Sequence, residues 1–321
     1  MNETKPKPLF AHIINPVTAN ENKELFETQK TTFASMLKAK QAFSQPDSIE
    51  LYTVGRFPSY ADCVPEGMKE LPALTRDVSD FVSNKKLKFP FLNDILQAAY
   101  DNTGAEYLIY TNLDISLMPY FYQTVSYYLN DGADALVINR RRLHNKFETE
   151  KRVEILQAEV GKLHPGYDCF VFKRSLFTKF IRKNICLVAP PACNDLFHNI
   201  FTFADNPKLL VDKHLTFHVG LELYKEWGSP EHWKYNYTEY VTFLSELYPH
   251  MDIEKFPGSD LNIFDRHFKW LMNPTLDYRI MFKLDARRGF KTSPPKEVDT
   301  FVADRKQRYL EWLLQKVNFK H

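Results

Sequence analysis

Glycine is scarce in this chain, and its scarcity excludes several common ways of binding phosphate. Only 10 of the 321 residues are glycine, well below the usual ~7%. The sequence contains no GxGxxG, GxxxxGK[ST] or GxSxG pattern. It therefore lacks the loops typical of dinucleotide-binding proteins, P-loop nucleotide hydrolases and α/β-hydrolases. A phosphate group, if this chain binds one, must be held in another way.

Clustered cysteine, an excess of one charge and long apolar runs are missing as well. The four cysteines form no CxxC pair, which fits neither a disulfide scaffold nor a structural zinc site and favours a reducing compartment. A net charge of +2 argues against general nucleic-acid binding. The first residues lack a signal-type apolar core, and no window reaches the ~18 apolar residues of a transmembrane segment. We therefore expect a cytoplasmic protein.

Short apolar runs and helical patterns alternate regularly through the first two thirds of the sequence. Hydrophobic residues make up 44% of the chain and aromatic residues 15%, enough for a sizeable core. The alternation predicts an α/β fold: a mostly parallel sheet sandwiched by helices and joined by right-handed crossovers. The predicted strands are 9–17, 49–54, 71–75, 106–110, 135–138, 169–172 and 209–211.

The strand signal fades near residue 227, where helical patterns take over. Apolar residues recur at helical spacing in 241–247, 261–272 and 309–317, linked by proline-containing loops. We therefore expect an α/β domain over 1–226 and a helical C-terminal extension over 227–321. The stripe in 309–317 has three readings that stay open: it packs on its own protein, on a second subunit, or peripherally on the inner face of a membrane.

The segment 107–119, YLIYTNLDISLMP, is the most informative in the chain. Its first four residues are apolar without alternation, as expected for a central parallel strand that is covered on both faces. Thr111, Asn112 and Asp114 therefore follow the carboxyl end of that strand. Open α/β sheets bind ligands in the crevice outside these ends. Asp114 is accordingly the first candidate for a functional residue.

The order of several segments resembles that of GT-A superfamily glycosyltransferases, particularly bacterial family-2-like members. The resemblance spans residues 8–227 and includes the Asn15-Pro16 strand exit, the NDIL helix, YLIYTNLDI, HPGYDCFVF and LTFHVG. It implies a metal-assisted hexosyl- or related sugar transferase that uses a nucleotide diphosphate-sugar donor. The acceptor, a glycan, a lipid-linked compound or a protein, is not specified. In that superfamily a DxD motif holds a divalent metal at the position of Asn112-Leu113-Asp114. Because Asn112 replaces the first acid, the resemblance supports only Asp114 strictly as a metal ligand.

Other candidate residues follow from the resemblance together with their chemistry. Mg²⁺ or Mn²⁺ stabilises the charge on a departing diphosphate, and Asn112 can supply a carbonyl ligand or bind a ribose hydroxyl. His218, and with less support His214, matches the late histidine of the superfamily, which would favour Mn²⁺. Asp168 can orient or deprotonate the acceptor hydroxyl. The alternatives are turn-capping roles for the acidic and amide side chains and a core role for the histidine.

Nucleotide binding is assigned to polar residues near the ends of the first strands. By superfamily analogy the base and ribose contacts are Asn15, Pro16, Arg56, Arg76 and Asp77. Lys88 can neutralise phosphate as a point charge, and the run of arginines at 140–142 can fork onto phosphate oxygens. For each of these charged residues, a solvated surface position remains the alternative.

Two other classes of function remain open at the level of sequence. A nucleotidyltransferase would form a sugar nucleotide instead of consuming one, but it usually has a glycine-rich basic loop after its first strand, and residues 15–18, NPVT, are not such a loop. A non-catalytic sugar- or nucleotide-binding module would retain the crevice and lose an acid. Asn112 is the residue that keeps this second alternative in view.

Overall fold

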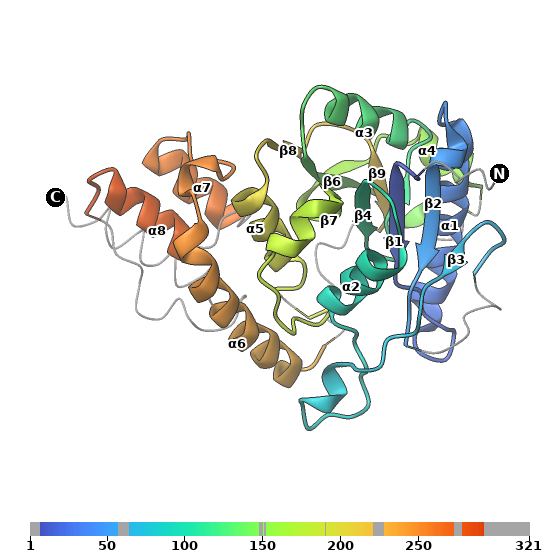
Figure 1. Cartoon of the computed structure of the whole chain (residues 1–321), viewed down its shortest axis with the longest axis horizontal. Coiled ribbons are helices and arrows are strands. Elements are labelled where there is room, and N and C mark those ends of the chain that lie inside the picture. The colour runs from blue at the N-terminus through green and yellow to red at the C-terminus, as the bar shows by residue number, and fades with distance from the viewer. Residues whose placement is uncertain are drawn as a thin grey trace, which may run out of the picture. The chain divides into compact units, whose positions relative to one another are not determined.

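The computed structural model describes residues 7–56, 64–147, 150, 152–189, 191–220, 228–272 and 278–291. The chain divides into two units, Met1–His250 and Met251–His321. The predicted division at residue 226 stays a prediction. The first unit contains the sheet and the helices that cover it (Figure 1).

The core of the first unit is a mixed sheet with the order β3-β2-β1-β4-β7-β6-β9-β5, in which β8 also pairs with β6. The strands β1 to β4 run parallel, and β7 is antiparallel to β4 and β6. The predicted α/β class with a mostly parallel sheet is confirmed. The strands of this main part are β1 (Phe10–Ile14), β2 (Ile49–Thr53), β3 (Lys69–Glu70), β4 (Tyr107–Thr111), β6 (Ala135–Leu143), β7 (Lys162–Lys173) and β8 (Pro207–Leu210).

Two strands continue past the main part and form a second, smaller part of the same sheet. The register of β6 against β7 shifts between Ile138 and Asn139 and again before Arg141. Beyond this bulge β6 pairs with β9 (Thr216–Val219), which pairs in turn with β5 (Ser116–Leu117). We call this smaller part the distal sheet. It consists of residues 162–167 of β7, residues 139–143 of β6, and the strands β9 and β5. It lies beside the loop that follows β4.

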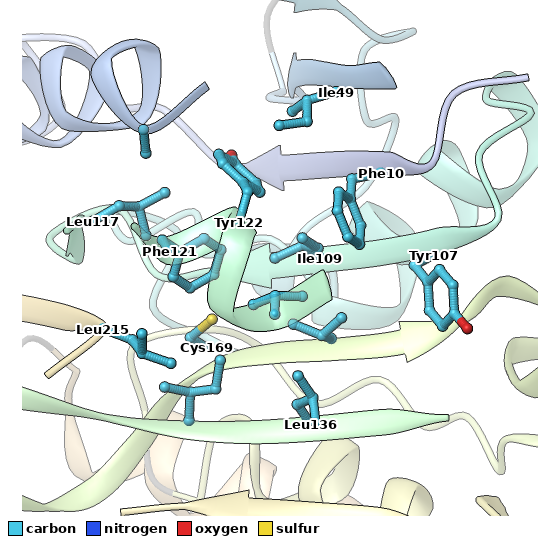
Figure 2. Close-up of a cluster of buried hydrophobic side chains, with 14 of the residues drawn as sticks. Phe10, Ile49, Tyr107, Ile109, Leu117, Phe121, Tyr122, Leu136, Cys169 and Leu215 are labelled. Atoms are coloured by element: carbon cyan, nitrogen blue, oxygen red, sulfur yellow. The ribbon is translucent and has the colours of Figure 1, made fainter. Parts of the chain in front are cut away.

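Helices cover both faces of the main sheet. On one face, α1 and α3 contribute Phe33, Met36, Phe121 and Val125 to the apolar cluster around Phe10, part of which Figure 2 shows. On the other face, α2 contacts β1 and β4, and α5 contacts β7. The helices are α1 (Lys23–Ala42), α2 (Leu92–Asn102), α3 (Phe121–Asn130), α4 (Val153–Ala158), α5 (Asn194–Phe203) and α6 (Pro230–Leu247).

Two asparagine side chains explain where α1 begins and how α6 is held against residues 186–189. The side chain of Asn22 accepts a hydrogen bond from the amide of Leu25 at 3.0 Å and caps α1. On α6, the buried side chain of Asn236 accepts from the amide of Cys186 at 2.9 Å and donates to the carbonyl groups of Cys186 and Ala189 at 2.8 and 2.6 Å. These bonds satisfy backbone groups of a stretch that otherwise pairs only through an isolated bridge between Cys186 and Phe91 among the described residues.

The structure corrects three sequence-based predictions of secondary structure. Residues 71–75 do not form a strand, although the amides of Leu71 and Leu74 bond to the carbonyl groups of Thr53, the last residue of β2, and Gly55. The strands predicted at 135–138 and 169–172 are too short, because β6 includes the arginine run 140–142 and β7 includes residues 164–168. Polar side chains interrupt the apolar pattern there because one face of the distal sheet is not part of the core.

The second unit is helical among its described residues. It contains α7 (Ile263–Met272) and α8 (Tyr278–Arg287), after a short 3₁₀ turn at Ile253–Lys255. The buried carboxylate of Asp285 on α8 accepts hydrogen bonds from Arg266 Nε at 3.1 Å and His267 Nε2 at 2.6 Å on α7. The predicted helix at 309–317 lies outside the described residues. Within the described parts of the chain, no helix combines the length and the apolar composition needed to cross a membrane.

Candidate active site

Asn112 ties the loop after β4 to the neighbouring strand β7. Its backbone amide donates to the carbonyl oxygen of Asp168 at 3.2 Å, and its side-chain Nδ2 donates to Asp168 Oδ1 at 3.0 Å. Its Oδ1 accepts a hydrogen bond from the hydroxyl of Tyr110 at 3.1 Å. Both ends of the Asn112 amide are therefore engaged with protein groups, and this side chain positions Asp168.

Asp114 lies at the tip of the same loop and pairs with His218 on β9. His218 Nε2 is 3.1 Å from Asp114 Oδ2, and the Asp114 side chain is 25% exposed. Burial raises the pKa of Asp114, but the imidazole of His218 and the guanidinium of Arg140 more than offset this, and the net pKa lies below its usual range. Asp114 is therefore ionised at neutral pH, and its carboxylate is directed to His218 on β9.

Asp168 is held by a second pair on the neighbouring strands. Arg140 Nη1 lies 2.6 Å from Asp168 Oδ2, and both side chains are largely buried. Arg140 Nη2 donates to His164 Nε2 at 3.3 Å. Burial and the charge of Arg140 lower the pKa of His164 to about 4, so its ring is neutral and can accept this bond. The backbone of Gly166 packs on the His164 ring, and a Cβ there would lie 2.8 Å from the ring carbon Cε1.

Asp195 is a third carboxylate at this position, and sequence analysis missed it. It lies in the first turn of α5, two residues after Cys193, whose Sγ is 3.8 Å from Asn112 Oδ1. Burial raises the pKa of Asp195 to about 7, although the amides of Leu196 and Asp195 and the Asn93 side chain oppose the shift. Asp195 Oδ1 accepts no hydrogen bond from the described residues. In the sequence, an Asn-Asp pair before a helical pattern is indistinguishable from an ordinary helix start.

The residues predicted to contact the nucleotide are only partly gathered at one place. Asn15 Nδ2 donates to the carbonyl of Val54 at 2.7 Å, which joins the exits of β1 and β2. At the same edge of the sheet, Arg56 Nη1 lies 2.5 Å from Asp77 Oδ2, and buried Pro16 follows Asn15.

Two of the predicted nucleotide contacts stand apart from that group. The guanidinium of Arg76 is bound by both carboxylate oxygens of Asp94 on α2, at 2.8 and 2.7 Å. Lys88 is exposed on the segment before α2. The structure therefore brings Asn15, Pro16, Arg56 and Asp77 together. Arg76 directly precedes Asp77, but its guanidinium is directed to Asp94 instead.

The donor atoms near Asp114 fit a divalent cation with a small protein ligand set. Among the described residues, no group of three or more His, Cys, Asp and Glu side chains has the geometry of a metal site. Asp114 and His218 would supply two ligands, and their 3.1 Å separation matches the roughly 3 Å between adjacent ligands of an ion bound at about 2.1–2.2 Å. Oxygen atoms of a bound substrate and water would have to complete the coordination shell. The third predicted ligand, Asn112, has its carbonyl engaged by Tyr110.

Comparisons with known proteins identify similar structures but no sequence family. No protein-family model matches the chain, and no curated protein matches it. Residues 1–349 of S. aureus TarS, in complex with UDP-GlcNAc, align with 88% of this chain and 93% of that one at 12% identity and a TM-score of 0.42. The mannosyltransferase PcManGT from Pyrobaculum calidifontis, in complex with GDP-Man and Mn²⁺, aligns with 99% of this chain and 89% of that one at 11% identity and a TM-score of 0.44. Glycosyltransferases are thus among the structures that this chain resembles, and its function has to be inferred from the site itself.

Proposed function

We propose that this protein transfers a sugar from a nucleotide diphosphate-sugar donor to an acceptor hydroxyl with the help of a divalent cation. The observation that carries the proposal is the convergence of Asp114, Asp168 and Asp195 around Tyr110 and Cys193, at the carboxyl end of the central strand β4. The three carboxylates have different surroundings. Asp114 is paired with an imidazole, Asp168 with a guanidinium, and Asp195 is buried with one oxygen that accepts no hydrogen bond from the described residues. Each carboxylate is therefore suited to a different task.

Asp114 and His218 are assigned to the cation that accompanies the donor. The low pKa of Asp114 keeps its carboxylate available as a ligand at neutral pH, and an imidazole in the ligand set favours Mn²⁺ over Mg²⁺. When bound, the cation would neutralise charge on the departing diphosphate. Asn112 contributes by fixing the loop that carries Asp114, since its amide is bonded to Asp168 and Tyr110.

Asp195 is assigned to the acceptor hydroxyl as a general base. A base works best when its pKa lies near the pH at which the enzyme operates, and burial raises the pKa of Asp195 to about 7. Asp168 is the residue that the sequence suggests for this role. Its carboxylate is shared between Arg140 and Asn112 at 2.6 and 3.0 Å, so we assign it to binding and orientation of the acceptor.

The nucleotide is assigned to the exits of β1 and β2, where Asn15, Arg56 and Asp77 gather. This edge lies on the opposite side of β4 from β7, β6 and β9 in the strand order. A donor that spans from this edge to Asp114 would place its sugar next to Asp168 and Asp195.

The proposal is tested with a thermal-unfolding screen of UDP, GDP, CMP and dTDP, each with and without Mn²⁺. A specific ligand at one hundred times its dissociation constant stabilises the folded state by about 2.7 kcal/mol. We expect at least one nucleotide diphosphate to raise the unfolding temperature, and to raise it more with Mn²⁺ present. If none of the four changes it, the assignment to nucleotide-sugar transfer is wrong. Binding without any turnover of a donor sugar would instead favour a non-catalytic binding module.

A further inference from the structure

Strained backbone is concentrated just before α5. Among the residues that the structure describes, Val188 and Cys193 are the two non-glycine residues with a left-handed backbone, at φ +75° and +63°. For a β-branched residue such as Val188 this conformation is a genuine outlier, because its Cβ lies too close to the following carbonyl oxygen. Strained residues persist only where their surroundings determine them, and they cluster at functional sites. The neighbours of Val188 must therefore impose its conformation.

The side chain of Asn236 on α6 anchors the backbone on both sides of Val188. It accepts a hydrogen bond from the amide of Cys186 at 2.9 Å and donates to the carbonyl oxygens of Cys186 and Ala189 at 2.8 and 2.6 Å. The amide of Leu187 is bonded separately to the segment before α2, at 2.9 Å. Asn236 is fully buried, so loss of these bonds would leave polar groups unsatisfied away from water. Because the groups around it are anchored, Val188 has to turn the chain.

The same contacts continue into the first turn of α5. The carbonyl oxygen of Ala189 also accepts a hydrogen bond from the amide of Ala192 at 3.0 Å. The next residue, Cys193, is the N-cap of α5, and its carbonyl oxygen accepts from the amide of Phe197 at 3.1 Å. Asp195 lies in the first turn of this helix and is 1% exposed. A series of contacts therefore joins Asn236 to the turn that carries the buried carboxylate.

The groups around Asp195 give it a buried environment without a counter-charge of its own. The hydroxyl of Tyr110 on β4 and the thiol of Cys193 interact electrostatically with it, and burial raises the pKa of both well above their usual range, so both are neutral at pH 7. The carboxylates of Asp114 and Asp168 act on the same two groups. A shift of α5 that admits water would therefore return the pKa of Asp195 toward its ordinary value.

We propose that Asn236 is a positioning residue of the candidate active site, which holds the Asp195 carboxylate in place through the strained backbone of Val188 and Cys193. The inference rests on the proposed function, because that function assigns Asp195 to the acceptor hydroxyl. All three hydrogen bonds of the Asn236 side chain go to the backbone of residues 186–189, so it acts on the carboxylate only through the chain. Relaxation of Val188 would shift the first turn of α5, and Asn236 prevents it.

The pH dependence that Asp195 gives to stability tests this inference. The difference in unfolding temperature between Asp195→Asn and the wild type is measured at pH 5 and at pH 8. Because the raised pKa of Asp195 makes the wild type lose stability as the pH rises, we expect this difference to increase over that range. When both chains also carry Asn236→Ala, the increase should fall to about half or less, because water then reaches the carboxylate. Other titrating groups are common to both chains of each pair, so their contributions cancel.

Gln29→Ala is the matched control. Gln29 on α1 is also fully buried, and its side-chain amide accepts from the amide of Val17 at 3.0 Å and donates to the Val17 carbonyl oxygen at 2.8 Å. Its replacement should lower the unfolding temperature but leave the pH-dependent increase from Asp195 unchanged. If Asn236 contributes to stability alone, Asn236→Ala should behave in the same way. Asn236→Ser, which keeps one polar atom, takes the place of Asn236→Ala if that variant does not fold.

An asparagine at position 188 tests the strain separately. Asparagine adopts a left-handed backbone more easily than valine, so Val188→Asn should raise the unfolding temperature by about 2–4 °C. Val160 is 62% exposed and has no left-handed backbone, so Val160→Asn should change it little. Combined with Asn236→Ala, Val188→Asn should restore much of the pH-dependent increase, because the chain then favours the required turn by itself.

Three results would overturn the inference. They are an undiminished pH-dependent increase in Asn236→Ala, an equal decrease in Gln29→Ala, and no rise in unfolding temperature with Val188→Asn. If nucleotides bind as proposed but this pattern fails, only the inference about Asn236 is lost. If the pattern appears but no nucleotide binds, Asn236 still positions Asp195, and the role of Asp195 in sugar transfer falls with the proposed function.

Discussion

Replacing Asp195 by asparagine removes one ionisable group while it keeps the shape of the side chain, so it separates the energetic and catalytic roles of this carboxyl. Burial raises the pKa of Asp195 from 3.8 to about 7. Because the folded state holds the proton more tightly than the unfolded chain, the wild-type protein loses stability as the pH rises from about 4 to about 7. The asparagine side chain of the variant cannot ionise and escapes this loss.

The magnitude follows from the size of the shift. One pKa unit corresponds to 1.36 kcal/mol, so the full cost of ionising Asp195 is about 4 kcal/mol, and roughly 2–3 kcal/mol of it develops between pH 5 and pH 8. We expect the free energy of unfolding of Asp195→Asn, relative to wild type, to rise by this amount over that range. Urea denaturation followed by circular dichroism measures it. A difference that stays constant with pH would show that the carboxyl titrates normally, and the reasoning would fail.

The same substitution has the opposite effect on activity. A general base must be deprotonated, so kcat/KM of the wild type should rise with pH through about 7. Asp195→Asn should reduce sugar transfer by a factor of about 10²–10⁴ while nucleotide binding persists. A variant that is both fully active and more stable at pH 8 would contradict the role assigned to Asp195.

Three further substitutions test other parts of the site. Asp114→Asn should remove the increase in UDP affinity that Mn²⁺ produces in the wild type, as measured by calorimetry with and without the ion. Arg140→Met should leave the Asp168 carboxylate without its counter-charge and lower the free energy of unfolding by about 3 kcal/mol in urea denaturation. Gly161→Ala should cost about 1–3 kcal/mol in the same assay, because Gly161 has φ +64° and a Cβ would lie 2.6 Å from the carbonyl oxygen of Arg142.

Matched substitutions serve as controls for the last two predictions. Arg152 forms an exposed pair with Glu150 at 2.8 Å, so Arg152→Met should leave the free energy of unfolding nearly unchanged. Gly104 has open space around its Cα, and Gly104→Ala should have little effect. If Arg140→Met changes the free energy of unfolding as little as Arg152→Met does, the buried pair of Arg140 and Asp168 contributes no more to stability than an exposed pair. If Gly104→Ala destabilises as much as Gly161→Ala, the steric explanation at Gly161 is wrong.

The main strands could be predicted from the sequence because their apolar pattern is continuous. Residues 49–54 and 106–110 were predicted within one residue of β2 and β4, as expected for strands covered on both faces. The distal sheet was missed because its strands carry polar residues on the side that faces the site. Arg140 to Arg142 and His164 interrupt the apolar run, so the pattern resembles a loop although the backbone is extended.

The candidate site also contains residues that the sequence reveals and residues that it does not. The position of Asp114 after an apolar strand was sufficient to single it out, and the structure places it 3.1 Å from His218; that the two residues share a metal stays a prediction. Asp195 could not be found in this way, because it is distinguished by burial, which raises its pKa, and by the contact of nearby Cys193 with Asn112, a residue distant in sequence. Long-range contacts of this kind leave no local signal.

β6 continues without extra residues past Ile138, where β7 bulges against it, and this makes the length of β6 as important as its composition. Successive side chains of a strand point to opposite sides, so deletion of a single residue there would send every later side chain of β6 to the other side. Arg142 would then be forced against Leu156 of α4, and Leu143 would face the carboxylates in its place. The number of residues in β6 past Ile138 therefore decides which side chains face the candidate site and which face the apolar cluster of Leu143 and Leu156.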